Sequence, residues 1–278
     1  MSSDKSRLLV VIILVFCKSN KKYIAALCSL FVVCHKHIGY FCNEFTDAPV
    51  FAMNIEPIAY FRSSFPSKFG IPRQSGIVNE LQGCIVFESE YRNADALRGL
   101  DAFDYIWLIW GFSANGKGNG WRPTVRPPLL GGNKAMGVFA TRSPFRPNPI
   151  GLSSVRIERI EYSSADGPLI YVCGADLMDG TPIYDIKPYV AYADAHSEAR
   201  SGFVDEKKWE TLTVNFPDDL CHIIPAELLP ALVKVLELDP RPQYHDDNSK
   251  VYGMPFDIFD IRFVVNDKQL TVVDIVKR

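Results

Sequence analysis

The 278-residue sequence lacks the motifs of the most common catalytic centres. It has no G-x-S-x-G nucleophile turn, no G-x-x-x-x-G-K-[ST] phosphate loop and no H-E-x-x-H metal motif. Serine hydrolases of that type, P-loop nucleotide hydrolases and zinc peptidases are therefore not expected. A site rich in Arg, Asn, Asp and backbone groups, without a nucleophile or a metal, would suit chemistry in which the electrophile arrives activated and the protein aligns the reactants.

The sequence also lacks a disulfide framework, because its seven cysteines are odd in number and include no C-x-x-C pair. Three isolated cysteines stand among apolar residues and are expected to pack as small hydrophobic side chains: Cys84, Cys173 and Cys221. Four possible metal ligands lie close together in a spacing that fits no familiar zinc finger: Cys34, His35, His37 and Cys42. We therefore expect no metal site.

No apolar run near the N-terminus is long enough to cross a bilayer. Residues 8–16 and 23–34 are both shorter than the roughly 18–20 residues that a spanning helix needs, and a poor signal-peptide cleavage site follows the first run. A regular strand pattern begins only after Met53. We interpret residues 1–52 as a dispensable extension, poorly ordered or helical, with Met53 as the working start. A membrane anchor is the alternative.

Acidic residues are absent from residues 105–157, which carry a net charge of +7 in a chain whose total is −2. The basic residues stand among prolines, glycines and aromatic residues rather than on one helical face. A basic stripe in an otherwise acidic protein indicates a ligand rich in phosphate. The alternative is a solvated face that merely lacks acids.

Short β-branched or aromatic runs bounded by Gly, Pro, Asn or Asp dominate the chain after residue 55. They predict strands at residues 58–61, 83–87, 105–112, 137–141, 152–160, 170–177 and 212–216. Only residues 94–100 predict a helix among them. Many short strands with few helices indicate a mainly β protein built on a closed or nearly closed β-barrel.

The pattern changes near Pro217. Residues 225–236, PAELLPALVKVL, predict an amphipathic helix that begins with proline, and residues 256–265 and 269–276 predict two further strands. After the extension we therefore predict a β-barrel catalytic domain at 53–216 and a small α+β domain at 217–278.

Two loops carry candidate ligand-binding residues. In PRQSG, residues 72–76, Arg73 and Gln74 offer a forked donor and an amide, which suit a carboxylate or a base edge; an exposed turn is the alternative. GKGNGWRPTVRPP, residues 116–128, has the glycines of a nucleotide-binding loop. It does not fit a Rossmann fold, because Trp121 and the Arg-Pro pair after it stand where the helix of that fold should begin. A basic loop whose tryptophan stacks on a base fits this second segment better, and a surface hairpin is the alternative.

The segment TRSPFRPNPIGL, residues 141–152, combines two arginines with three prolines. Proline fixes φ and favours extended backbone, so Arg142 and Arg146 project from a pre-ordered track, which lowers the entropy cost of binding an anion.

In DGTPIYDIKPY, residues 179–189, a turn precedes Asp185 and Lys187, which point the same way on an extended segment. They either serve a ligand or form an ion pair.

Six segments stand in the order found in a known family: PRQSG, ALRGLDAFDYIWLIWGF, WRPTVRPP, GVFATRSPFRPNPIGL, DGTPIYDIKPY and DPRPQY. From about Ile55 to its C-terminus the chain strongly resembles the bacterial S-adenosylmethionine-dependent tRNA adenine N6-methyltransferases, the YaeB/TsaA-like class. The resemblance implies a β-barrel catalytic domain unlike the Rossmann-type methyltransferases, a homodimer and a cytoplasmic location. It also implies S-adenosylmethionine as cofactor and, as substrate, N6 of threonylcarbamoyl-adenosine 37 beside the anticodon of tRNA-Thr.

The resemblance also implies site residues. Its cofactor contacts are Pro72, Arg73, Gln74, Arg142, Leu152, Asp179, Gly180, Thr181 and Pro182. Family members often carry Phe-His where this chain has Phe112-Ser113, so Ser113 and Ala114 are expected to contact the cofactor through their backbone. The expected tRNA contacts are Lys117, Trp121, Arg122, Arg126, Arg146 and Arg241, with Arg146 facing either ligand. No general base is assigned, although Asp185 and Tyr189 are candidate helpers. The alternative function is a non-catalytic RNA-binding barrel.

Overall fold

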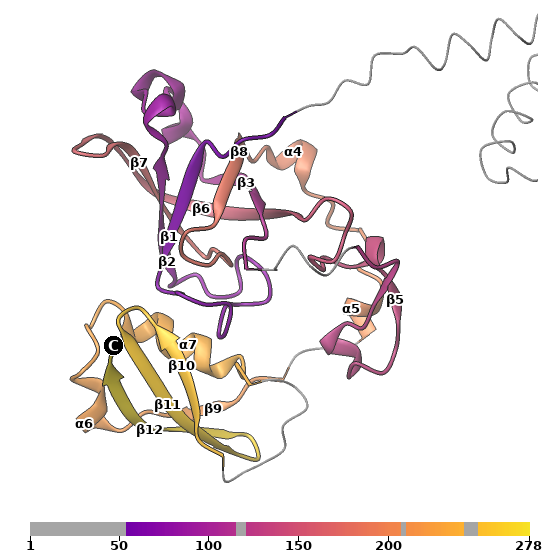
Figure 1. Ribbon diagram of the computed structural model, residues 1–278, viewed down its shortest axis with the longest axis vertical. Coiled ribbons are helices and arrows are strands. Elements are labelled where there is room, and N and C mark those ends of the chain that lie inside the picture. Colours follow the sequence, from indigo (N-terminus) through magenta and orange to yellow (C-terminus); the bar gives the residue numbers. More distant parts are fainter. Residues whose placement is uncertain (1–53, 115–120, 207–209, 242–249) are drawn as a thin grey trace, which may run out of the picture. The chain divides into compact units, whose positions relative to one another are not determined.

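The computed structural model describes residues 54–114, 121–206, 210–241 and 250–278 (Figure 1). The predicted extension, Lys117 and the four cysteines and histidines near the N-terminus all lie outside the described residues. The chain divides into two units, Met1–Asn54 and Ile55–Arg278, and every helix and strand named here belongs to the second.

Six antiparallel strands close into a barrel in the order β1-β2-β7-β6-β3-β8 (Figure 1). Pairing of β8 with β1, with Ala59 opposite Ile183, completes the closure. The strand bounds are β1 (Ala59–Ser63), β2 (Gln82–Phe87), β3 (Tyr105–Gly111), β6 (Ile150–Ser164), β7 (Gly167–Cys173) and β8 (Pro182–Pro188). The mainly β fold with a closed barrel, predicted from the spacing of short strands, is confirmed.

Alternating side chains fill the barrel. In β3, Ile106, Leu108 and Trp110 are buried whereas Tyr105 is exposed, as expected when successive side chains of a strand point to opposite faces. The neighbouring strands contribute the same kind of inward residue, including Ala59, Phe61, Ile85, Val155, Ile170, Val172 and Ile183.

A second hydrophobic core lies under a four-stranded sheet of order β10-β11-β12-β9. Its elements are β9 (Thr213–Asn215), α7 (Leu229–Glu237), β10 (Tyr252–Phe256), β11 (Phe259–Asn266) and β12 (Gln269–Lys277). The buried side of α7, with Leu232, Val235 and Leu236, packs in this core together with the inward residues of β11. The apolar face that the amphipathic pattern predicts for this helix therefore packs in the second core.

The long loop between β1 and β2 also packs in the second core. Phe65, Val78 and Leu81 are buried there, and the Phe65 ring meets Phe256 edge to face at 5.5 Å between centroids. Because this loop carries residues 72–76, both of its ends are fixed by packing before any ligand arrives.

The remaining elements are short. Strands β4 (Thr124–Val125) and β5 (Met136–Gly137) form a two-stranded ladder, and single helical turns occur at α4 (Ala191–Asp194), α5 (Phe203–Glu206) and α6 (Asp218–Cys221). The 3-10 turns are Ser89–Tyr91, Ala94–Leu97, Leu100–Ala102, Pro128–Leu130 and Val138–Ala140.

Two predicted elements are wrong in type. Residues 137–141 are not a strand, because the chain turns after Gly137 and the Thr141 hydroxyl closes a 3-10 turn by donating to the Val138 carbonyl at 2.9 Å. Residues 94–100 are not one helix. Two 3-10 turns take its place, separated by Gly99 at a φ of 85°, a left-handed conformation that ends helices.

Strands β8 and β10 were not predicted as strands. The predicted strand at 212–216 exists as β9, but it pairs in parallel with β12 rather than within the barrel. The division of the chain at Pro217 therefore stays a proposal, with β9 belonging to the C-terminal sheet.

Candidate functional site

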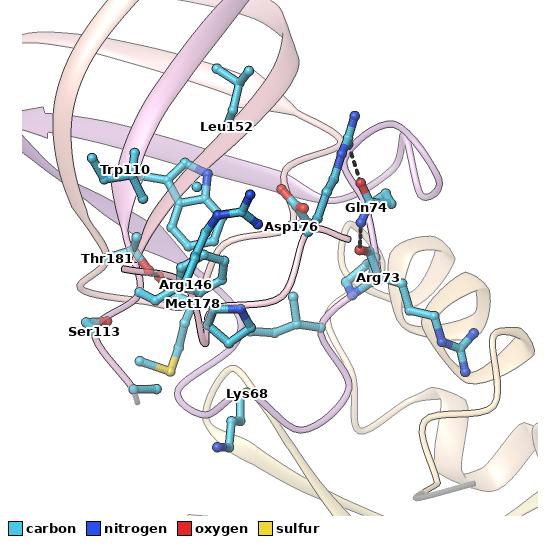
Figure 2. Close-up of a pocket in the computed structure, with 18 of the residues that line it drawn as sticks. Lys68, Arg73, Gln74, Trp110, Ser113, Arg146, Leu152, Asp176, Met178 and Thr181 are labelled. Carbon is cyan, nitrogen blue, oxygen red and sulfur yellow. Dashed lines mark hydrogen bonds between the residues drawn. The ribbon is translucent and has the colours of Figure 1, made fainter. Parts of the chain in front are cut away.

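One end of the barrel holds a cavity of about 490 Å³, here called the barrel-end cavity (Figure 2). Four segments line it: the β1–β2 loop, the end of β3, the proline-rich segment that leads into β6, and the connection from β7 to β8. Its lining residues are Lys68, Ile71, Pro72, Arg73, Gln74, Trp110, Phe112, Ser113, Ala114, Thr141, Arg142, Pro144, Arg146, Ile150, Gly151, Leu152, Asp176, Met178 and Thr181. Antiparallel pairing brings these strand ends to the same rim.

Much of the wall is aromatic or aliphatic. The Trp110 and Phe112 rings lie 4.4 Å apart between centroids, and Leu152 and Met178 also line the space. Gly151 allows the indole to lie flat against the backbone, because a Cβ there would come within 2.3 Å of the Trp110 ring. Such a wall suits a flat, weakly polar group such as a nucleobase.

Polar groups gather on the other side. Arg142 donates to the Gln74 side-chain oxygen, and the Gln74 amide nitrogen donates to the Arg73 carbonyl (Figure 2). These bonds tie the β1–β2 loop to the proline-rich segment, so two distant motifs of the sequence meet at one place. A guanidinium oriented in this way suits a carboxylate.

Arg73 and Arg146 line the cavity, but their side chains are used within the protein. Figure 2 shows Arg73 turned away from Trp110 and Thr181; its guanidinium donates to the Leu238 carbonyl at 3.3 Å. Burial lowers the pKa of Arg73, and Asp239 opposes that shift. Arg146 donates to the carbonyls of Thr141, at 2.9 Å, and Ser143, at 3.3 Å, so it also braces the turn of its own segment.

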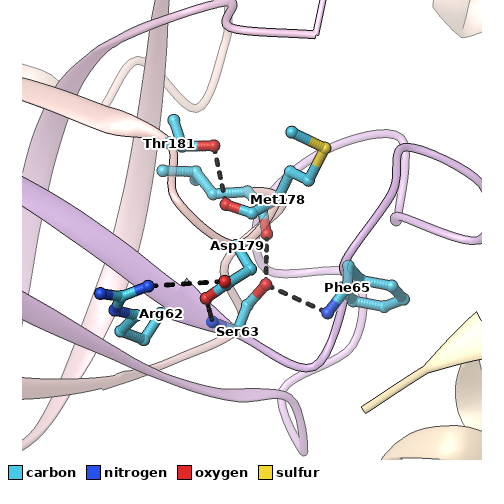
Figure 3. Close-up of polar contacts among 7 residues, drawn as sticks. Arg62, Ser63, Phe65, Met178, Asp179 and Thr181 are labelled. Atoms are coloured by element: carbon cyan, nitrogen blue, oxygen red, sulfur yellow. Dashed lines mark hydrogen bonds and ion pairs between the residues drawn. The ribbon is translucent and has the colours of Figure 1, made fainter. Parts of the chain in front are cut away.

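The DGTP turn is used differently from the expectation (Figure 3). Of its four residues only Thr181 lines the barrel-end cavity. Asp179 accepts from the Ser63 N–H at 3.2 Å and lies 3.6 Å from the Arg62 guanidinium, and the Gly180 N–H donates to the Phe61 carbonyl at 2.8 Å. Asp179 and Gly180 therefore fasten the connection before β8 to β1, and Pro182, the first residue of β8, pairs with Tyr60 of β1.

Asp176 was missed by the sequence analysis. Its carboxylate lines the cavity and accepts from the buried Ser153 hydroxyl at 2.6 Å. Burial raises the pKa of Asp176, while the Ser153 hydroxyl, nearby backbone N–H groups and Arg142 oppose that shift. A lone carboxylate directly after the apolar run of β7 was the available signal, since an acid rarely enters such a setting without a role.

Known proteins resemble this chain over most of its length. Residues 60–195 match the tRNA-methyltransferase O N-terminal domain, and residues 211–278 match the TrmO C-terminal domain. The tRNA (adenine(37)-N6)-methyltransferase of Escherichia coli is 38% identical over 224 residues, which are 78% of this chain and 94% of that protein. This chain belongs to the tRNA-methyltransferase O family.

Two further likenesses support this membership. A protein of Pseudomonas aeruginosa named "Putative S-adenosylmethionine-dependent methyltransferase RcsF" is 36% identical over 208 residues, which are 72% of this chain and 87% of that protein. The crystal structure of TrmO from Pseudomonas aeruginosa is 29% identical and superimposes with a TM-score of 0.65, covering 81% of this chain and 98% of that chain. The family predicted from six motifs, the tRNA adenine N6-methyltransferases of the YaeB/TsaA-like class, is thus confirmed.

A second, larger hollow of about 1480 Å³ adjoins the barrel-end cavity, and we call it the basic cavity. It shares Arg73, Gln74, Thr141, Arg142 and Pro144 with its neighbour and adds Arg122, Arg126, Phe139 and Phe145. The Arg122 guanidinium lies 5.4 Å from the Phe145 ring centroid. Charged and aromatic groups together suit a nucleic acid.

The other predicted tRNA contacts are scattered. Trp121 is exposed but lines neither cavity. Arg241 lines a small hollow of about 300 Å³ beside α7 and makes a 2.8 Å ion pair with Asp239. Lys117 lies outside the described residues.

Asp185 and Tyr189, the candidate helpers in catalysis, line none of these three hollows. Asp185 instead forms a 2.8 Å ion pair with Lys187, the alternative left open by their spacing. The Tyr189 ring packs beside Tyr105 and Trp107, at 6.2 and 5.6 Å between centroids. The geometry gives neither residue a place at the cavity.

Among residues 54–114, 121–206, 210–241 and 250–278, no group of three or more His, Cys, Asp or Glu side chains is placed to hold a metal ion. Within the same part of the chain no helix is long and apolar enough to cross a membrane. Of the cysteines there, Cys173 is buried and Cys84 and Cys221 are half-buried, all with free thiols.

Proposed function

We propose that this protein transfers a methyl group from S-adenosylmethionine to N6 of adenosine 37 in a tRNA. The relative from Escherichia coli is named for that reaction and covers most of the chain, and the Pseudomonas aeruginosa relative is named for its dependence on that cofactor. One structural observation carries the proposal: three motifs, at residues 72–76, 112–114 and 141–152, converge on a single cavity.

The barrel-end cavity fits this cofactor in size and chemistry. Its volume of about 490 Å³ lies within the roughly 300–1,000 Å³ usual for small-molecule sites. The Trp110 and Phe112 side suits the adenine ring, and Arg142, oriented by Gln74, suits the carboxylate of the methionine part. When bound, S-adenosylmethionine supplies a methyl group on a sulfonium, an electrophile that needs no further activation.

Residue roles within this cavity form part of the proposal. Pro72 and Gln74 shape the carboxylate end, and Leu152 and Thr181 contribute side-chain contacts. Ser113, where family members often carry a histidine, and Ala114 offer backbone groups. Arg73 acts through position rather than contact, because its guanidinium donates to Leu238. By the same argument Asp179, Gly180 and Pro182 shape the site from behind.

We place the tRNA at the basic cavity. It opens beside the cofactor, which is where the acceptor base must come, and Arg122 and Arg126 line it. The net charge of +7 over residues 105–157 supports an RNA backbone as partner. Phe139, which is 73% exposed at the same place, suits stacking on an unpaired base of the anticodon loop.

The finer details rest on the family resemblance. They are threonylcarbamoyl-adenosine as the modified base, tRNA-Thr as the carrier, a homodimer and a location in the cytoplasm, where tRNA is modified. The carbonyl attached to N6 in that base withdraws electrons, so its proton leaves more readily than that of plain adenosine.

Two measurements test the proposal. Calorimetric titration of the full chain with S-adenosylmethionine should show saturable binding, and mass spectrometry should find the methylated threonylcarbamoyl-adenosine only in tRNA from cells that carry the gene. Binding without any change in the nucleosides would favour a non-catalytic RNA-binding protein. Absence of S-adenosylmethionine binding would refute the proposed methyltransferase function.

A further inference from the structure

Asp176 stands alone as an acid in the barrel-end cavity. The charged side chains among the described lining residues are Lys68, Arg73, Arg142, Arg146 and Asp176. No histidine, cysteine, tyrosine or second carboxylate occurs among those lining residues. A proton released in this cavity therefore has one carboxylate within reach.

A directed chain of hydrogen bonds holds this carboxylate. The Trp110 indole can only donate, and it donates to the Ser153 hydroxyl at 3.0 Å. The Ser153 proton must then point onward, to Asp176 Oδ1 at 2.6 Å. Because Oδ1 is an acceptor in this chain, a proton taken up by Asp176 goes to Oδ2.

The surroundings of this chain favour a usable base. Ser153, on β6 opposite Leu108 of β3, is buried, so its hydroxyl has little freedom to choose another partner. Burial raises the pKa of Asp176, and Ser153, the backbone N–H groups of Asp176 and Ser75, and Arg142 hold part of that rise back. A carboxylate whose pKa is raised toward the working pH accepts a proton better than an exposed one.

We propose that Asp176 is the catalytic residue that accepts the N6 proton of the substrate adenine, and that Ser153 and Trp110 position it. The proposal deepens the function proposed above and rests on it. It assigns a role that the helpers Asp185 and Tyr189 cannot fill from their places outside the cavity.

The step balances with the groups named. The N6 lone pair forms a bond to the methyl carbon, the carbon–sulfur bond breaks and its electron pair stays on sulfur, which becomes a neutral thioether. The proton of N6 passes to Asp176 Oδ2 and from there to solvent. The carboxylate is regenerated and no oxidant or reductant is needed.

Asp176→Asn keeps the shape and removes the base. We expect the single-turnover rate of methyl transfer at saturating cofactor and tRNA to fall by roughly 100-fold or more, the usual share of a general base. Calorimetric affinities for S-adenosylmethionine and for tRNA should change by less than about threefold. Asp166→Asn, an exposed carboxylate in the turn between β6 and β7, is the matched control and should leave the rate unchanged.

The positioning chain has its own signature. The rate should be lost as pH falls through the raised pKa of Asp176, because only the carboxylate accepts a proton. Ser153→Ala removes a group that stabilises the charged form, so this acidic limb should move to higher pH. The same shift can be followed by carbon NMR of the ligand-free protein labelled in its aspartate carboxyls. The carboxyl resonance with the raised titration midpoint should be absent in Asp176→Asn, and in Ser153→Ala its titration midpoint should move to higher pH. Trp110→Phe, which keeps an aromatic ring but removes the indole donor to Ser153, gives a second test of the same upward shift if Ser153→Ala does not fold.

Three outcomes would overturn the assignment. A full rate and an unchanged acidic limb in Asp176→Asn would show that the proton goes elsewhere. Cofactor affinity weakened more than tenfold, with the saturated rate intact, would make Asp176 an anchor for the cofactor's amino group instead. A wild-type protein that binds S-adenosylmethionine but methylates no tRNA would refute the proposed function first, and this inference with it.

Discussion

Gly151 offers the sharpest test of how the barrel-end cavity is built. The residue pairs with Trp110 across β3 and β6, and a Cβ added there would lie 2.3, 2.4 and 2.6 Å from three atoms of the indole ring. The ring has little room to yield, since Trp110 is buried, packs against Phe112 and donates to Ser153. Gly151→Ala must therefore displace the ring or the strand.

The magnitude follows from these contacts. Restoring an ordinary separation of 3.4 Å or more moves the ring by about 1 Å, and overpacking of this kind costs ~1–3 kcal/mol. Loss of the Trp110–Ser153 hydrogen bond adds ~1 kcal/mol. We expect Gly151→Ala to lower the free energy of unfolding by about 2–4 kcal/mol, which at the lower figure corresponds to a melting temperature roughly 4–8 °C lower.

The assay compares two glycine substitutions. Thermal and urea unfolding of Gly151→Ala should be read beside Gly137→Ala, because a Cβ at Gly137 meets nothing within 4 Å and the backbone there has a negative φ. The control should melt within about 1 °C of the wild type, as most exposed substitutions do. Calorimetry should also show weaker S-adenosylmethionine binding for Gly151→Ala, since the displaced ring enters the cavity.

Equal melting temperatures for the two variants would contradict this reasoning. That result would mean that the Trp110 ring is not held where the structure places it. If the melting temperatures were equal but Gly151→Ala bound the cofactor more weakly, the Trp110 ring would lie at the cavity without contributing to stability.

Three further predictions concern single side chains. Arg142→Ala should weaken S-adenosylmethionine binding by ~1–3 kcal/mol in calorimetry, whereas Arg98→Ala, an exposed arginine paired with Asp95, should not; equal effects would exclude a carboxylate contact. Arg126→Ala should lower by about one the slope of log affinity for tRNA against log salt, and an unchanged slope would move the RNA elsewhere. Burial raises the pKa of Cys84 to about 11, so at pH 8 iodoacetamide should label it far more slowly in the folded protein than in urea; equal rates would deny that burial.

The barrel strands were predictable because they are short β-branched or aromatic runs bounded by Gly, Pro, Asn or Asp. In β3 the run YIWLIWG is apolar throughout, so its composition predicts a strand, whereas the buried side, with Ile106 and Leu108, is seen only in the structure. Strand β8 escaped because it carries Asp185 and Lys187 and has proline at both ends, a composition typical of loops. Its pairing with β1 and β3 overrides that local preference.

The candidate site was predictable only where a segment has an unusual composition. Gln74 and Arg142 were predicted as ligand-binding residues in two such segments, 68 residues apart, and the structure joins them by a hydrogen bond at the cavity. Asp176 was missed because its one local signal, a lone carboxylate after the apolar run of β7, does not show its partner: the hydroxyl that holds it belongs to Ser153, 23 residues earlier on β6. The DGTP turn shows the opposite case, in which a motif predicts ligand contacts but its residues contact the protein. Turn residues have the same composition whether they bind a ligand or, as Asp179 does here, join two strands.

The β1–β2 loop explains what the C-terminal sheet contributes to a site that lies in the barrel. Phe65 and Val78, on either side of the PRQ motif, are buried in the second core, and Arg73 within the motif donates to the carbonyl of Leu238 just after α7. Gln74 is the next residue, and it holds the Arg142 guanidinium. The packing of the second core therefore sets where the proposed carboxylate-binding end of the cavity lies, and precise alignment is what catalysis without a covalent intermediate requires.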